Sequence, residues 1–470
     1  MQSDLAKKDI LVLLIVSLIF RLPALNQSLW LDEATSVLAA KNLGITELLT
    51  AFAPGDFHPP LYYLLLKIWI SVFGAGEIAV RMLSVTFGVL TVYFVYRLGT
   101  FLFNRTVGIV TALFLATAPL HVYYSQEARM YALATLFATL SVLYFAKLVA
   151  TDKPSYREWL LFVVTTVLLL YTDYLPVLLL PFYALILLKQ RMHFRKYKKE
   201  WLTAGVSIFL LLLPWLPVFI EQVKTGLLVK SNAPLWWSTL GRTSIKQVLL
   251  VPVKFMIGRV SLYNKMLYGG LMLLVSGFFG VLFFQAGRFF SKNKFLWYWL
   301  FVPLLVGSIL GVWLSVFSYF RFLFLLPAFY MLVSYGVISV GKRKLRIFAA
   351  TVVIVLNFLT TYAYLTTPRF QRENWKGAVS WIEEQPIGER AVSIFVTRNQ
   401  RDPYFYYAKR VPAYGPEGLD DNTIDTIYLV RYVQPMFDPE DRLRRKVENM
   451  DYKKQEERDF NGVTIWRYTK

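Results

Sequence analysis

The chain has 470 residues, of which 56% are hydrophobic and 17% aromatic, and it carries a formal net charge of +21. Apolar runs of about 17–25 residues, the length of a helix that crosses a bilayer, recur along it. The absence of cysteine excludes disulfides, thiol catalysis and Cys-based metal sites. Lys and Arg gather in short loops between the apolar runs, which indicates membrane orientation and not nucleic-acid binding. The composition predicts a polytopic α-helical membrane protein.

We expect about eleven membrane-spanning helices, because that many apolar runs are long enough. In chain order, the predicted ranges are 10–25, 79–98, 107–122, 130–147, 158–173, 175–188, 201–221, 267–286, 296–315, 322–341 and 346–366. With the N-terminus in the cytoplasm, every dense basic loop lies inside, including KQRMHFRKYKK at 189–199. The protein is then a multi-pass cell-membrane protein whose loop 26–78 and C-terminal domain are extracytoplasmic.

Two apolar stretches between the spans are predicted to lie at the membrane surface. HPPLYYLLLKIWISVFG at 58–74 is short and carries Lys67 in its middle, so we interpret it as an interfacial helix in the first outer loop. NAPLWWS at 232–238 has paired tryptophans, which suit an interfacial anchor.

From residue 367 onward the sequence is polar and charged. AVSIFV at 391–396, TIYLVRYV at 426–433 and GVTIWRYT at 462–469 have the pattern of strands. Helical patterns at 374–385 and 438–450 alternate with them. The chain is therefore predicted to consist of a transmembrane domain, 1–366, and a small extracytoplasmic α/β domain, 367–470.

Polar side chains gather close to the outer ends of the predicted spans. They are Asp32 and Glu33 in LWLDE, His58 in HPP, Glu127 and Arg129 in YYSQEARMY, Asp173 in YTDY, and Tyr319 and Arg321 in SYFR. Ionisable groups beside hydrocarbon are costly and mark function. Carboxylates and guanidinium groups on one face suggest a polar cavity for an anionic, hydroxyl-rich substrate.

Each of these residues also has a structural interpretation. Asp32 and Glu33 would suit the start of a helix at 34–43, and Glu127 would pair with Arg129 on a solvated loop. His58 and Asp173 would mark a turn and a helix end, and Arg321 would be a snorkelling charge. The functional interpretation depends on their shared position on the outer face.

Five motifs carry a family resemblance: LDEA, HPPLYYLL, AVRMLSVTFGVLTVYFVYRLG, YYSQEARMYAL and RENWKGAV. In this order they resemble the dolichyl-phosphate-mannose protein mannosyltransferase-like proteins, glycosyltransferase family 39, whose bacterial members include the lipid A aminoarabinose transferase. These enzymes belong to the GT-C superfamily and use polyprenyl-phosphate sugars. The resemblance covers about residues 10 to 385 and implies the all-α GT-C membrane fold.

The resemblance also implies roles for individual residues. Asp32 matches the family's catalytic carboxylate in the first outer loop, and Glu127 matches the second carboxylate of the site. Glu33, the neighbour of Asp32 in the same motif, is expected to bind substrate. His58 matches a position near the donor phosphate, and Arg321 matches, more loosely, an arginine that approaches it. Asp173 stands where many relatives have histidine, so no role is carried over to it.

The residue types fit glycosyl transfer from a polyprenyl-phosphate donor to a lipid, glycan or protein acceptor. The phosphate leaves as an anion, so the site needs cations for the phosphate and a base for the acceptor hydroxyl. Our hypothesis makes Asp32 the base of an inverting reaction, with Glu127 orienting the acceptor. His58, Arg321 and Arg129 would meet the phosphate, and Tyr319 would bind substrate beside them.

Two alternatives stay open at this point. Asp32, Glu127 and His58 would suit Mg²⁺ or Mn²⁺, and their spacing does not decide whether the enzyme uses a metal. The main functional alternative is a transporter or flippase of lipid-linked sugars, but the chain lacks the paired halves typical of transporters. The expected processes are protein glycosylation or the synthesis of cell-surface glycans such as lipopolysaccharide.

Overall fold

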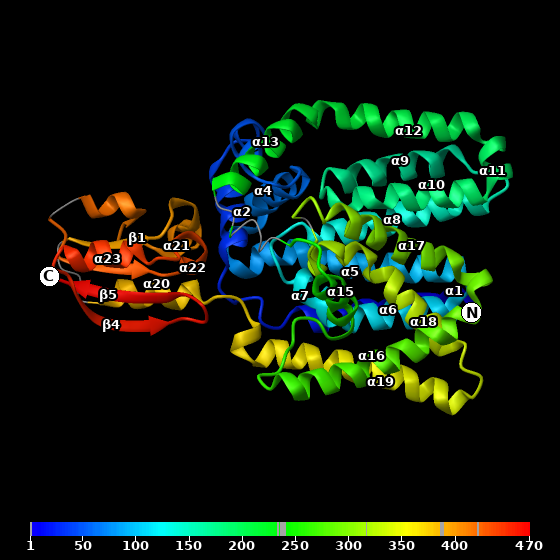
Figure 1. Cartoon of the computed structure of the whole chain (residues 1–470). Helices are drawn as coiled ribbons and strands as arrows, with labels where there is room; N and C mark the ends of the chain where they lie inside the picture. Colours follow the sequence, from blue (N-terminus) through cyan, green and yellow to red (C-terminus); the bar gives the residue numbers. More distant parts are fainter. Residues whose placement is uncertain (1, 233–234, 236–240, 316, 386–389, 421–422) are drawn as a thin grey trace.

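The computed structural model describes residues 2–232, 235, 241–315, 317–385, 390–420 and 423–470. A large helical part is joined to a smaller α/β domain at the C-terminal end, and the two lie side by side (Figure 1). The exact domain boundary near residue 367 stays a prediction. Trp236 and Trp237, the predicted interfacial anchor, lie outside the described residues.

Each predicted span coincides with a helical segment. The segments are α1 (Gln2–Arg21), α5 (Glu77–Leu102), α6 (Arg105–Thr117) with α7 (Pro119–Ser125), α8 (Tyr131–Ala150), α9 (Tyr156–Leu170), α10 (Leu179–Lys189), α12 (Lys198–Leu212) with α13 (Leu216–Asn232), α16 (Lys265–Gly287), α17 (Phe290–Leu310), η5 (Tyr319–Leu325) with α18 (Leu326–Ile338), and α19 (Arg343–Thr366). Among the described residues, seven helices are long and apolar enough to cross a membrane, or eight if α6 and α7 form one bent span. The predominantly helical fold with a small C-terminal sheet is confirmed. The count of eleven spans, the interfacial position of α4 and the extracytoplasmic position of the C-terminal domain stay predictions.

The break between α6 and α7 determines where the polar segment after α7 lies. Pro119 begins α7 and has no N–H to donate, so the helix cannot continue through it, and the two helices meet at 61°. Every residue of α7 is buried, as are Gln126, Glu127 and Ala128 after it. The bend therefore sends a polar segment into the protein instead of out into solvent.

The first outer loop is more helical than its sequence suggests. α2 (Leu31–Asn42) starts with LDE, and α4 (Leu61–Phe73) is the helix expected at the membrane surface. Shorter helices α3 (Ile45–Glu47), η1 (Leu48–Phe52) and η2 (Ala53–Gly55) connect them. α15 (Ile245–Ile257), which contains Pro252, lies in the expected loop before α16 and was not predicted.

The C-terminal domain is built on a five-stranded sheet with the order β2-β1-β3-β5-β4. Its strands are β1 (Ala391–Phe395), β2 (Ala413–Tyr414), β3 (Thr426–Val430), β4 (Lys453–Asp459) and β5 (Thr464–Thr469), and its helices are α20 (Trp375–Glu384), α21 (Asp402–Tyr407), α22 (Gln434–Phe437) and α23 (Arg442–Asn449). β1 pairs with β2 and β3 in parallel, whereas β5 runs antiparallel to β3 and β4. The predicted strands and helices are present, but β4, with the sequence KKQEERD, was missed because its side chains are almost all charged.

The C-terminal domain packs against the first outer loop. The Leu29 N–H donates to the hydroxyl of Tyr407 at 2.9 Å, and the Thr35 hydroxyl donates to Asp402 at 2.6 Å. These contacts fix the domain at the end of the helical part where α2 lies (Figure 1).

Candidate active site

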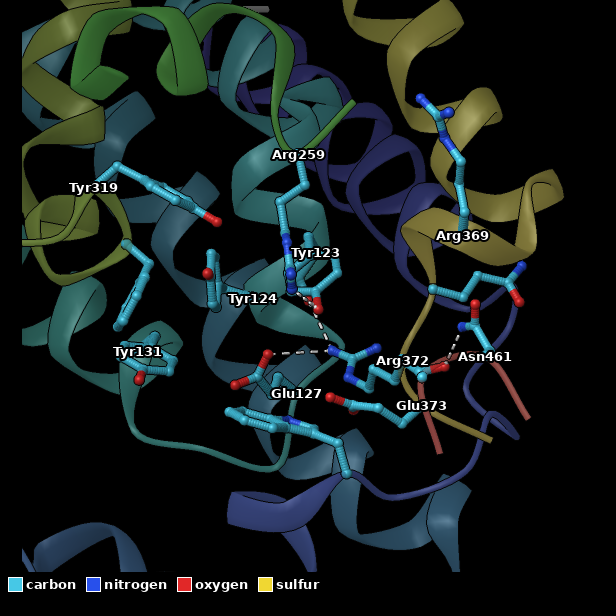
Figure 2. Close-up of a pocket in the computed structure, with 14 residues that line it drawn as sticks. Tyr123, Tyr124, Glu127, Tyr131, Arg259, Tyr319, Arg369, Arg372, Glu373 and Asn461 are labelled. Carbon is cyan, nitrogen blue, oxygen red and sulfur yellow. Dashed lines mark hydrogen bonds and ion pairs between the residues drawn. The ribbon is translucent and has the colours of Figure 1, made fainter. Parts of the chain in front are cut away.

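A cavity of about 300 Å³ lies where the helical part meets the C-terminal domain. Figure 2 shows that its walls come from segments far apart in the chain. Its lining residues are Trp30, Tyr123, Tyr124, Glu127, Tyr131, Arg259, Tyr319, Phe320, Arg369, Gln371, Arg372, Glu373, Asn461 and Gly462. The set combines an aromatic wall with three arginines and two carboxylates, which suits an anionic substrate that also carries a ring.

Glu127 projects into this cavity from the segment after α7 (Figure 2). One carboxylate oxygen, Oε2, lies 3.4 Å from Nη2 of Arg372. The other oxygen, Oε1, is buried without a hydrogen-bond partner among the described residues. Burial raises the pKa of Glu127 to about 7, against the opposing effect of Arg372, and nearby Glu33 raises it further. The side chain can therefore accept a hydrogen bond from a substrate and can change protonation state near neutral pH.

Arg259 and Arg372 bring two positive charges to one aromatic ring. Their guanidinium carbons lie 4.6 and 4.7 Å from the ring centroid of Tyr123, and Arg259 also donates to the Tyr123 hydroxyl. No ion pair found among the described residues involves Arg259. Two convergent guanidinium groups, one without a counter-ion, are suited to a phosphate.

A glycine explains how Arg259 reaches the cavity. Gly258 ends α15 with a φ of +65°, a conformation that side-chain-bearing residues rarely adopt. A Cβ atom at this position would lie 2.9 Å from the side chain of Pro119, at the start of α7. The close approach of these two backbones places Arg259 beside Tyr123.

The opposite wall of the cavity is aromatic. The ring centroids of Tyr124 and Tyr131 are 5.0 Å apart, and those of Tyr131 and Phe320 are 5.6 Å apart. Tyr319, predicted to bind substrate, lines the same wall (Figure 2). This wall offers ring faces together with hydroxyl groups, a surface suited to a sugar.

Glu33 lies outside the cavity and is completely buried. Its Oε2 lies 2.6 Å from Nη2 of Arg81 and 3.4 Å from Nε of Arg372, and its Oε1 accepts the Ala128 N–H at 2.8 Å. Burial alone would raise the pKa of Glu33, but Arg81 and Arg372 outweigh that effect and lower it. Glu33 therefore joins α2 to α5, to the Glu127 segment and to residue 372.

Asp32 and His58 belong to a neighbouring polar cluster centred on Arg129. Nη2 of Arg129 lies 3.8 Å from Oδ2 of Asp32 and 3.1 Å from Nδ1 of His58. His58 in turn lies 3.5 Å from Asp56, whose carboxylate accepts the Tyr63 hydroxyl. The Asp32 side chain is 40% exposed, so it is open to solvent or substrate.

The structure therefore divides the predicted site residues into groups. Glu127 and Tyr319 line the cavity, and Asp32, His58 and Arg129 form the neighbouring cluster. Glu127 and Arg129 do not pair with each other, since their ion pairs are with Arg372 and Asp32. The two acids at 32 and 127 lie in segments joined directly by the hydrogen bond between Glu33 and Ala128.

Two predicted polar residues do not line the cavity but lie beside the site. Arg321 is close enough to Tyr131, and Asp173 close enough to His58 and Arg129, to interact electrostatically. The guanidinium of Arg321 packs 6.0 Å from the ring centroid of Phe320 and does not line the cavity. Asp173 accepts the N–H of Leu175 at 3.1 Å, as expected of a residue that ends a helix.

Arg81, Arg259, Arg372 and Glu373 were not predicted. The sequence could have indicated a buried ion pair at Arg81, because an arginine inside the apolar run 79–98 needs a partner there. Arg372 and Glu373 begin the motif RENWKGAV, which was used only for the family resemblance. Arg259 follows a glycine in a loop, and nothing in the sequence links it to Tyr123.

A metal site would need several His, Asp or Glu side chains close together. Among the described parts of the chain, no group of three or more His, Asp or Glu side chains could hold a metal ion. Asp32, Glu127 and His58 are thus not arranged as a ligand set.

The comparisons with known proteins agree with the architecture. Residues 57–217 match the family described as dolichyl-phosphate-mannose-protein mannosyltransferase. The chain is similar to ArnT from Cupriavidus metallidurans in the apo state (12% identity, TM-score 0.61) and bound to undecaprenyl phosphate (12%, TM-score 0.56), with 99% of this chain and 98% of that chain covered in both. It is also similar to the Archaeoglobus fulgidus oligosaccharyltransferase in complex with Zn and sulfate (13%, TM-score 0.54, covering 97% of this chain and 72% of that one). A sequence comparison with curated proteins finds no match. The resemblance to GT-C glycosyltransferases is confirmed.

Proposed function

We propose that this chain is a membrane glycosyltransferase with a lipid-linked phosphate-sugar donor. Two findings support the proposal: residues 57–217 match a mannosyltransferase family, and the whole chain resembles ArnT in fold. One observation carries the proposal: the cavity holds Arg259 and Arg372 opposite a buried carboxylate, Glu127, that has one unpartnered oxygen. ArnT, which has this fold, was solved with undecaprenyl phosphate, a ligand of the proposed donor class.

Arg259 and Arg372 bind the donor phosphate in this proposal. Cleavage of the bond between the anomeric carbon and the phosphate oxygen leaves a phosphate anion and passes through an oxocarbenium-like transition state. Negative charge grows on the phosphate during cleavage, so guanidinium groups fixed beforehand stabilise the transition state more than the ground state. Arg372 is buried, which strengthens its share of this effect.

Glu127 and Asp32 act on the acceptor. The free oxygen of Glu127 accepts a hydrogen bond from the acceptor or sugar hydroxyl and orients it. Asp32, at the edge of the site and close enough to the cavity residue Tyr131 to interact with it electrostatically, takes the acceptor proton as general base. Attack by that hydroxyl on the face opposite the phosphate inverts the anomeric centre. The acceptor is a lipid, glycan or protein at the extracytoplasmic face.

The direct test is a transfer assay with the purified full chain in lipid nanodiscs. Radiolabelled undecaprenyl-phosphate sugars are supplied as donors, and membrane lipid, glycan and protein fractions as acceptors. We expect label to move to one acceptor fraction and the Asp32→Asn variant to be slower by about 10²–10⁴-fold. A chain that moves intact donor across the bilayer of a liposome without transferring sugar would be a transporter, and the proposal would fail.

A further inference from the structure

The turn between β4 and β5 holds the backbone of the segment that carries Arg372. Nδ2 of Asn461 donates to the carbonyl oxygens of Pro368 and Arg372, at 2.9 and 2.8 Å. In the other direction, the Asn374 N–H donates to the carbonyl oxygen of Phe460 at 3.0 Å. The turn therefore forms hydrogen bonds to the backbone of this segment both before and after Arg372.

The conformation of the turn depends on its own residues. Asn461 and Gly462 have φ values of +54° and +98°, in the left-handed region that asparagine and glycine tolerate best. The Gly462 N–H donates to the Asp459 carboxylate at 3.2 Å, and the Thr464 hydroxyl donates to the same side chain at 2.8 Å. These bonds give the Asn461 side chain a defined direction.

The held segment reaches into the candidate active site. The backbone of Arg372 is bound to Asn461, whereas its guanidinium lies 3.4 Å from Glu33. The guanidinium also lies 3.4 Å from Glu127, a contact shown in Figure 2. Asn461 and Gly462 also line the cavity. The next residue, Glu373, accepts the Tyr432 hydroxyl at 3.3 Å, which adds a second contact with the C-terminal domain.

We infer that Asn461 is a positioning residue that fixes the Arg372 guanidinium for the donor phosphate, so that the C-terminal domain completes the active site. This inference rests on the proposed function, because the phosphate is the ligand that Arg372 would hold. A long arginine side chain binds a phosphate tightly only when its backbone is fixed, since otherwise binding must order the segment.

The test compares three variants of the full chain in nanodiscs. Asn461→Gly keeps the left-handed backbone and removes both side-chain hydrogen bonds. Asn461→Asp keeps the shape of the side chain but cannot donate to the two carbonyl oxygens. Asp451→Gly is the matched control, because Asp451 also has a positive φ, +64°, but lies before β4, at the opposite end of that strand.

Hydrogen exchange and undecaprenyl phosphate binding are measured for each variant. We expect faster exchange in peptides covering 368–374 and about tenfold weaker binding in Asn461→Gly, the size expected from two lost hydrogen bonds. Asn461→Asp should bind at least as weakly, and Asp451→Gly should stay within twofold of the parent chain. In the transfer assay, the limb of the pH profile set by Glu127 should move to higher pH, because Arg372 lowers the pKa of that residue.

The outcomes separate the two claims. Unchanged exchange at 368–374 in Asn461→Gly would overturn the positioning role, whatever the chain binds. Faster exchange with unchanged binding and an unmoved pH limb would also overturn it. A parent chain that neither binds undecaprenyl phosphate nor transfers sugar would instead overturn the proposed function.

Discussion

The guanidinium of Arg372 lies 3.4 Å from the carboxylate of Glu127, although the two residues are 245 positions apart in the chain. Glu127 follows a broken helix near the start of the helical part, and Arg372 comes just after the last long helix. Donor phosphate and Glu127 would compete for this guanidinium. When phosphate binds Arg372, the Glu127 carboxylate becomes freer to accept a hydrogen bond from the second substrate.

Sugar transfer should depend on pH with a midpoint near 7. Burial raises the pKa of Glu127 to about 7, so the residue is mostly protonated below that pH and becomes a weaker hydrogen-bond acceptor for the acceptor hydroxyl. Activity should therefore fall as the pH drops from 8 to 6. A pH–rate profile measured at limiting donor, which reports the pKa of the free enzyme, checks this expectation. A rate that rises toward pH 6 would contradict it.

Glu127→Gln should remove that pH dependence. The amide has the shape of the protonated acid and does not ionise, so the fold should be kept while the rate falls by about 10–10³-fold. Comparing the transfer rates of variant and parent at pH 6 and pH 8 gives the result. If the rate of Glu127→Gln still falls between pH 8 and pH 6, another group causes that pH dependence.

Arg259→Ala should weaken undecaprenyl phosphate binding by about 10–100-fold, the size of one or two charge-assisted hydrogen bonds. Arg259→Lys should recover part of the affinity, because lysine keeps the charge but loses the planar fork. Binding isotherms in nanodiscs measure both. The control is Arg97→Ala, since Arg97 is exposed on α5 and its guanidinium donates to Tyr93, away from the cavity. Equal losses in both alanine variants would refute the assignment.

Glu33→Gln should lower stability more than it alters substrate recognition. Removing one partner of a buried ion pair leaves Arg81 without its carboxylate, at a cost of about 3–5 kcal/mol. Thermal unfolding of the purified variant measures this loss. Glu77→Gln serves as the control, because Glu77 pairs with the exposed Lys376 and should contribute less than about 1 kcal/mol.

The same variant gives a pH test of stability. The pKa of Glu33 is lowered in the folded chain, so its stabilising contribution is present above the pKa of the unfolded chain and is lost as the pH falls. The difference in melting temperature between the parent and Glu33→Gln should shrink in acid. A difference that grew with acidification would show that Glu33 is protonated in the fold.

The sequence predicted the helical segments and most of the C-terminal sheet because their signals are local. Apolar runs and alternating strands depend only on neighbours, whereas the charged strand β4 exists because it pairs with β5. The break at Pro119 was missed because the apolar run continues across it. Local pattern identifies elements but not how a helix bends.

The candidate site shows the same limit. Glu127 was predicted because an acid between two spans is unusual in its local context. Arg259 and Arg372 meet at Tyr123 only through tertiary packing, and neither loop has an unusual composition. Glu33 and Asp32 are neighbours in sequence, yet the first turn of α2 sends one into a buried ion pair and leaves the other at the edge of the site.

The hydrogen bonds between the β4–β5 turn and the segment after α19 have a consequence for protein engineering. A fragment cut at residue 366, where the hydrophobic part ends, would keep the apolar helices but lose Arg372 and the turn that holds it. Exchanging the C-terminal domain with that of a similar protein would likewise transplant one wall of the candidate site. Chimeras are therefore better joined before α19, or with the exchanged turn and the 368–374 segment taken from the same parent.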